Sequence, residues 1–87
     1  MQIAIVLYHG MTALDAIGPY EVLRSMPDAE IRFVSHQPQP VTTDSGVLIL
    51  GATHSYDETL QPDIVLVPGS SADTTTAMAD KQLLTWL

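Results

Sequence analysis

The chain has 87 residues, 46% of them hydrophobic, and 10 acidic residues against 3 basic ones give it a net charge of −7. This length allows one small domain or part of one, and the hydrophobic fraction is too high for a disordered chain. Three cations are too few to bind a nucleic acid through this segment, and no apolar run approaches the roughly 18 residues of a membrane span. The lack of cysteine excludes disulfides and a thiolate nucleophile within these residues.

A short apolar run lies at residues 3–7 (IAIVL). Because it does not alternate between polar and apolar residues, it predicts a strand covered on both faces, as in a parallel sheet. The N-terminal residues have neither the basic region nor the cleavage pattern of a signal peptide, so we expect a cytoplasmic protein. Tyr8-His9-Gly10 then marks the change from strand to loop.

A helix is predicted after this loop, with Thr12 as its N-cap and Asp15 in its first turn. Gly18-Pro19 interrupts the apolar spacing of this helix. Because proline removes one helical hydrogen bond, two alternatives remain: a kinked helix, or a short turn followed by a main helix that begins at Pro19. Both alternatives place Asp15 between the first strand and the body of the helix.

The remaining segments predict a strand, a hairpin, another strand and a final helix. Residues 30–35 alternate in polarity, which is typical of a strand near a sheet edge. Residues 41–43 and 47–50 predict a hairpin in which Gly46 has a positive φ, whereas residues 52–61 are polar and irregular. The apolar run at residues 63–67 is the clearest pattern of a buried strand, and an apolar helix is expected after residue 71.

This order of strands and helices predicts an α/β protein with a parallel sheet. Ligands bind beyond the carboxyl ends of the strands in such sheets, which here means the loops at residues 8–18 and 68–73. One or two helices cannot cover both faces of this sheet. We therefore interpret residues 1–87 as the N-terminal portion of a single α/β domain.

Two features in these loops are candidates for chemistry. Asp15 is flanked by apolar residues, so we expect its carboxyl to be partly shielded from water and to favour the protonated form; the alternative is an ordinary first-turn acid. Gly69-Ser70 lies in a turn that leads into a helix, where free amides can hold an anion or a developing oxyanion. The alternative there is a simple loop with Ser70 or Ser71 as the helix N-cap.

The three histidines do not form a local metal-binding pattern. His9, His36 and His54 lie in different segments, without the spacing of a zinc site, so we interpret them as surface or capping residues. The serines lack the G-x-S-x-G motif of serine hydrolases. We therefore expect neither a metal nor another cofactor.

The motifs along the chain resemble the ThiJ/PfpI superfamily, and in particular its isocyanide hydratase-like branch. That branch begins with an apolar strand, a short loop and a helix with the pattern Leu-Asp-x-x-Gly-Pro-x-(Asp/Glu)-Val-Leu. The matching residues are Leu14-Asp15, Gly18-Pro19 and Glu21-Val22-Leu23, followed by Pro40-Val41 and Ser45-Gly46 in the hairpin and Asp63 with Pro68-Gly69 in the later strand. The resemblance implies a flavodoxin-like parallel-sheet sandwich with a β-hairpin insertion, of which this chain covers about the first half.

The same resemblance implies roles for three residues. The family's nucleophile is a cysteine on a strand-to-helix elbow, in a segment that would follow Leu87. Asp15 stands where the family has the acid that hydrogen-bonds to this cysteine. Gly69 and Ser70 stand where the family has amides that polarise the substrate, and the Ser70 side chain is expected to narrow the pocket because many members have glycine there.

Two functions are therefore expected for the whole protein. The first is a cysteine-dependent enzyme that hydrates small isonitriles to N-formamides and forms a homodimer, as members of the family commonly do. The alternative is the small-molecule-sensing domain of an AraC-type transcriptional regulator. In either case the isolated segment is expected to be inactive.

Overall fold

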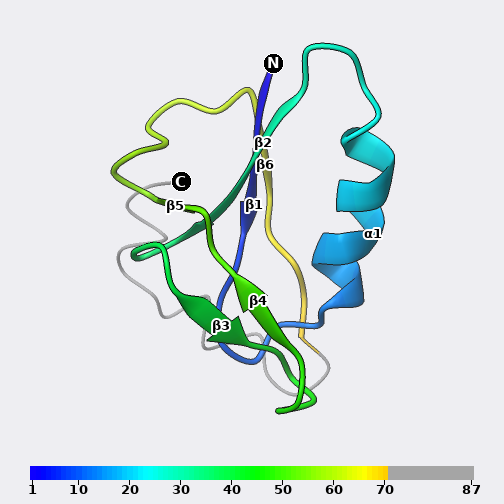
Figure 1. The fold of residues 1–87 in the computed structure, drawn as a ribbon, viewed down its shortest axis with the longest axis vertical. Helices are drawn as coiled ribbons and strands as arrows, with labels where there is room; N and C mark the ends of the chain where they lie inside the picture. Colours follow the sequence, from blue (N-terminus) through cyan, green and yellow to red (C-terminus); the bar gives the residue numbers. More distant parts are fainter. Residues whose placement is uncertain (71–87) are drawn as a thin grey trace.

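The structure is a computed structural model and describes residues 1–70 of the chain. Within these residues a four-stranded parallel sheet has the order β5-β2-β1-β6, and a separate antiparallel hairpin is formed by β3 and β4 (Figure 1). The elements in chain order are β1 (Gln2–Val6), α1 (Leu14–Leu23), β2 (Glu30–Ser35), β3 (Pro40–Thr42), β4 (Ile49–Gly51), β5 (His54–Ser55) and β6 (Ile64–Leu66). The predicted α/β class with a parallel sheet and a hairpin is confirmed. The predicted final helix lies outside the described residues.

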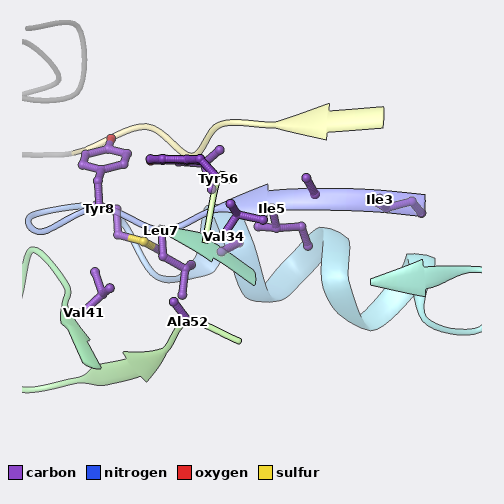
Figure 2. Close-up of a cluster of buried hydrophobic side chains, with 12 residues drawn as sticks. Ile3, Ile5, Leu7, Tyr8, Val34, Val41, Ala52 and Tyr56 are labelled. Atoms are coloured by element: carbon purple, nitrogen blue, oxygen red, sulfur yellow. The ribbon is translucent and has the colours of Figure 1, made fainter. Parts of the chain in front are cut away.

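The central strand β1 is the core of the described fold. It pairs with β2 on one side and β6 on the other, and residues 3–6 have no exposed surface. Figure 2 shows the buried side chains following β1 from Ile3 to Tyr8, with Val34 and Tyr56 packed beside them. The continuous apolar run is thus explained by a strand that is covered on both faces, as predicted.

The helix α1 runs back along the sheet after β1 (Figure 1). Its N-cap is Ala13, with no side-chain capping bond, so the prediction of Thr12 as the N-cap is wrong. The Thr12 hydroxyl instead donates to the Asp44 carboxylate at 2.7 Å. The helix is continuous through Pro19, which resolves the two alternatives in favour of one helix. Gly18 has no Cβ to clash with the proline ring, so helical backbone before Pro19 is tolerated.

A short strand, β5, was missed by the sequence analysis, which treated residues 52–61 as irregular. This strand pairs with the last two residues of β2, Val34 and Ser35. The backbone N–H of Thr53 also donates to the Phe33 carbonyl at 2.8 Å, which guides the chain onto the sheet. Since the strand has only two residues, its sequence carries no periodicity that would reveal it.

The hairpin differs from the prediction in the bounds of its strands. Val41 pairs with Leu50, so the strands are shifted outward and residues 43–48 form a longer loop. Gly46 has a φ of 75°, as predicted, and thus supplies the conformation that other residues rarely adopt. The hairpin lies at the end of the sheet where β1 and β6 finish (Figure 1).

The strand β6 is more exposed than predicted. Ile64 and Val65 are each 39% exposed and Val67 is 44% exposed, although this run has the clearest sequence pattern of a buried strand. The reason is its position: within residues 1–70, β6 pairs only with β1 and its outer edge has no strand partner. Native proteins normally cover an apolar edge of this kind or protect it with charged residues.

Candidate functional site

The candidate site is formed where β1 and β6 end side by side. The two strands are parallel neighbours, with Ile5 opposite Leu66, so the loops that follow them leave the sheet at the same edge. This juxtaposition places the loop before α1 next to residues 67–70 (Figure 1). It is the place where α/β sheets bind ligands.

Asp15 and Gly69 are in direct contact across this edge. The Gly69 backbone N–H donates to Asp15 Oδ2 at 3.1 Å. The Gly69 carbonyl accepts from the Thr12 backbone N–H at 2.8 Å. Residue 69 is therefore hydrogen-bonded through both of its backbone groups to the segment that begins α1, which brings the two sequence-predicted site residues together.

Two side chains tie the residues on either side of Gly69 to the loop after β1. The Tyr8 hydroxyl donates to the Pro68 carbonyl at 2.7 Å, and Ser70 Oγ donates to the Gly10 carbonyl at 2.6 Å. Tyr8 and Pro68 are buried, whereas Ser70 is half-buried. The Ser70 side chain, which was expected to narrow the pocket, donates its hydroxyl to the backbone carbonyl of residue 10.

The hairpin is attached to the same loop. The Gly10 N–H donates to the Thr42 carbonyl at 2.9 Å, and the Asp44 N–H donates to the Met11 carbonyl at 2.7 Å. His9 Nδ1 accepts from the Thr42 N–H at 3.2 Å. The site thus rests on three segments far apart in the sequence: residues 8–15, 42–44 and 68–70.

The Asp15 side chain is exposed in this structure. The shielding from water that its apolar neighbours predicted is therefore not found within the described residues. On a helix, residues 14 and 16 point to different sides from residue 15, so apolar neighbours in the sequence do not cover it. Leu14 itself is 72% exposed, and of these neighbours only Ala16 is buried.

The sequence profile of the DJ-1/PfpI family matches residues 1–87, which is the whole chain. The chain belongs to the DJ-1/PfpI family. It is 34% identical over 87 residues to an isonitrile hydratase of Pseudomonas putida, and it covers 37% of that protein's length. A crystal structure of a ThiJ/PfpI family protein from Pseudomonas syringae superposes with a TM-score of 0.90 at 31% identity, over 98% of this chain and 35% of that chain.

Sequence analysis missed Tyr8 and Gly10 as structural parts of this DJ-1/PfpI site. Gly10 has a φ of 90°, a conformation that favours glycine and sets the direction of the carbonyl that Ser70 contacts. The available signal was the Tyr8-His9-Gly10 turn directly after a buried strand. The partner of each residue lies 60 positions away in the chain, so the turn alone did not reveal the contact.

Histidines and acids do not form a metal centre in the described part of the DJ-1/PfpI chain. Within residues 1–70, no group of three or more metal-ligating side chains is brought together. His9 and His36 are exposed, and His54 is half-buried in β5. No helix in the described range is long and apolar enough to cross a membrane.

Burial raises the pKa of the Tyr8 phenol above its ordinary value of 10.0, and the negative charges of Asp15 and Asp44 raise it further. Tyr8 is therefore a neutral hydrogen-bond donor at physiological pH. Because the folded pKa is raised, the stabilising contribution of the neutral phenol is complete below about pH 10 and is lost as the pH rises through the folded pKa.

We expect Asp15→Asn and Asp44→Asn each to lower the pKa of Tyr8, because each removes a nearby negative charge. The measurement is ultraviolet difference absorption of tyrosinate in the folded chain, with Tyr8→Phe subtracted to isolate Tyr8 from Tyr20 and Tyr56. Asp57→Asn, at an exposed residue in the turn after β5, is the matched control and should leave the titration unchanged. Equal titration curves for all three variants would contradict the electrostatic contribution.

Proposed function

We propose that residues 1–87 form the N-terminal portion of a single DJ-1/PfpI domain in an isonitrile hydratase-like enzyme. The enzyme hydrates small isonitriles to N-formamides with a cysteine nucleophile supplied by another part of the domain. The observation that carries this proposal is the contact between Asp15 and the Gly69 amide at the shared end of β1 and β6. The 34% identity to an isonitrile hydratase supports the choice of substrate class.

Asp15 is the catalytic acid in this proposal. A carboxyl beside a thiolate stabilises the thiolate by donating a hydrogen bond to it, and it can then pass that proton to the substrate. In the proposed enzyme, the rest of the domain supplies the cysteine nucleophile and so completes the site. The exposure of the Asp15 side chain in the described residues leaves room for that nucleophile.

Gly69 and Ser70 supply the backbone amides that polarise the substrate. The Gly69 N–H donates to Asp15 Oδ2, and such a bond is stronger to a carboxylate than to a neutral carboxyl. When Asp15 carries its proton the bond is weaker but is kept, so the Gly69 N–H can be shared between Asp15 Oδ2 and the substrate. After the proton leaves, the bond between the Gly69 N–H and the carboxylate strengthens.

The reaction balances with one proton and one water. The thiolate forms a C–S bond with the terminal carbon of the isonitrile while Asp15 transfers its proton to that carbon, which gives a thioimidate. Water then adds to the same carbon, the C–S bond breaks, and the thiolate leaves. One proton from water returns to Asp15 and the other remains on nitrogen, so the product is an N-substituted formamide.

The experiment is a chimera in which residues 1–87 replace the matching segment of the Pseudomonas putida isonitrile hydratase. The expected result is formation of N-formamide from a small alkyl or aryl isonitrile, followed by the formyl proton in NMR. The C-terminal part of the relative without this segment should be inactive, because it lacks the acid. A chimera that folds as the parent does but forms no formamide contradicts the proposal, and saturable binding without turnover would favour the sensing function.

The proposed enzyme is a cytoplasmic, homodimeric lyase that needs no cofactor and acts on a small-molecule substrate. Its homodimeric state follows the common behaviour of the family. Size-exclusion chromatography with light scattering measures it, and a monomeric, active chimera would contradict it.

A further inference from the structure

Gly69 lies between two residues that are each anchored to the loop after β1. Pro68 accepts the Tyr8 hydroxyl at 2.7 Å, and Ser70 Oγ donates to the Gly10 carbonyl at 2.6 Å. The Tyr8 bond holds the peptide group that carries the Gly69 N–H, and the Ser70 bond holds the side chain of the next residue. This leaves the Gly69 N–H pointing at Asp15 Oδ2, at 3.1 Å.

We propose that Ser70 is a positioning residue whose hydroxyl bond to Gly10 orients the Gly69 amide and, through it, the Asp15 carboxyl. The inference deepens the proposed function and rests on it. Of the two anchors, Tyr8 is 7% exposed and contributes a ring to the core, so its loss would also disturb packing. Ser70 is half-buried, and its hydroxyl donates at 2.6 Å, against 2.7 Å for the Tyr8 hydroxyl.

The orientation has a chemical consequence for Asp15. Because Oδ2 accepts the Gly69 N–H, the proton of the neutral carboxyl resides on Oδ1. The amide thus makes Asp15 a donor with one defined direction. Loss of the Ser70 hydroxyl removes one of the bonds that fix residues 68–70, beside those from Tyr8 and Thr12, so the Gly69 N–H is held less firmly and the two carboxyl oxygens compete more evenly for the proton.

The first test is the Ser70→Ala variant of the chimera. We expect kcat to fall about five- to tenfold, the effect of losing one part-buried hydrogen bond, with a smaller change in KM. Ser70→Thr retains a hydroxyl and should recover most of the activity. Ser25→Ala is the matched control, because Ser25 is exposed in the turn beyond the far end of α1.

The second test does not depend on turnover. Glycine-selective ¹⁵N labelling of the chimera gives a small set of amide resonances, in which Gly69 is assigned by its loss in Gly69→Ala. Its proton resonance should move downfield as Asp15 ionises, and Asp15→Asn should abolish this movement. In Ser70→Ala we expect the size of this pH-dependent shift of the Gly69 resonance to fall to about half, since the bond from Gly69 to the Asp15 carboxylate is weakened.

These outcomes separate the two proposals. An unchanged kcat together with an unchanged Gly69 titration in Ser70→Ala overturns the positioning role. If the chimera with Ser70 unchanged folds but is inactive, the proposed function is contradicted. Comparison of its pH-dependent Gly69 shift with that of Ser70→Ala still decides the role of Ser70. The positioning role of Ser70 is established if Ser70→Ala lowers both kcat and the pH-dependent shift of the Gly69 resonance, and Ser70→Thr recovers kcat.

Discussion

The Asp15→Asn chimera is expected to show a kcat about a thousandfold below that of the unsubstituted chimera. Asparagine has the shape of aspartate, and its carbonyl oxygen can still accept the Gly69 N–H that now reaches Oδ2 at 3.1 Å. Its amide has no proton to transfer to the substrate carbon at neutral pH. The loss of activity therefore reports the missing proton transfer and not a missing contact between Asp15 and Gly69. Steady-state formamide formation measures this loss.

Asp15→Ala removes the Gly69 contact as well as the proton, so we expect its kcat to be equal to that of Asp15→Asn or lower. Asp57→Asn makes the same chemical change at an exposed residue outside the site and should retain full activity. Thermal unfolding of all three variants verifies that they fold. Normal turnover in either Asp15 variant would remove this residue from the mechanism.

Gly69→Ala is the second change with a large expected effect. A Cβ built on Gly69 lies 3.2 Å from Asp15 Oδ2, closer than such contacts normally are. The backbone of Gly69 is not in the left-handed region, so alanine brings no conformational strain and its methyl group acts only by displacing the carboxylate. Misplacement by less than 1 Å is enough to lower kcat by about 10- to 100-fold.

Gly51→Ala provides the matched control for this steric effect. Gly51 also lacks a positive φ, and a Cβ there meets nothing within 4 Å. It should leave both kcat and the melting temperature close to those of the unsubstituted chimera. If Gly69→Ala were equally silent, the close approach of residue 69 to Asp15 would have no role in catalysis.

Local patterns predicted most of the fold because the residues that produce them lie close together in the chain. The unbroken apolar run at residues 3–7 follows from the burial of β1 between two strands, and residues 30–35 form β2 with the predicted bounds. The Leu14-Asp15 and Gly18-Pro19 motif led to the family, which the match over the whole chain confirms. An element that forms only through strand pairing could not be predicted in this way. The strand β5 has two residues and forms because it pairs with the edge of β2.

The amino-acid sequence by itself determined the α/β class, the order of its main elements and the family. It also singled out Asp15, Gly69 and Ser70 as candidates. Only the tertiary structure decided that Asp15 meets the amide of a residue 54 positions away, and that Ser70 bonds to Gly10 across 60 positions. It likewise decided that Asp15 and β6 are exposed. The physical reason is that periodicity and turn chemistry act over a few neighbouring residues, whereas strand order sets which distant loops meet and what covers them.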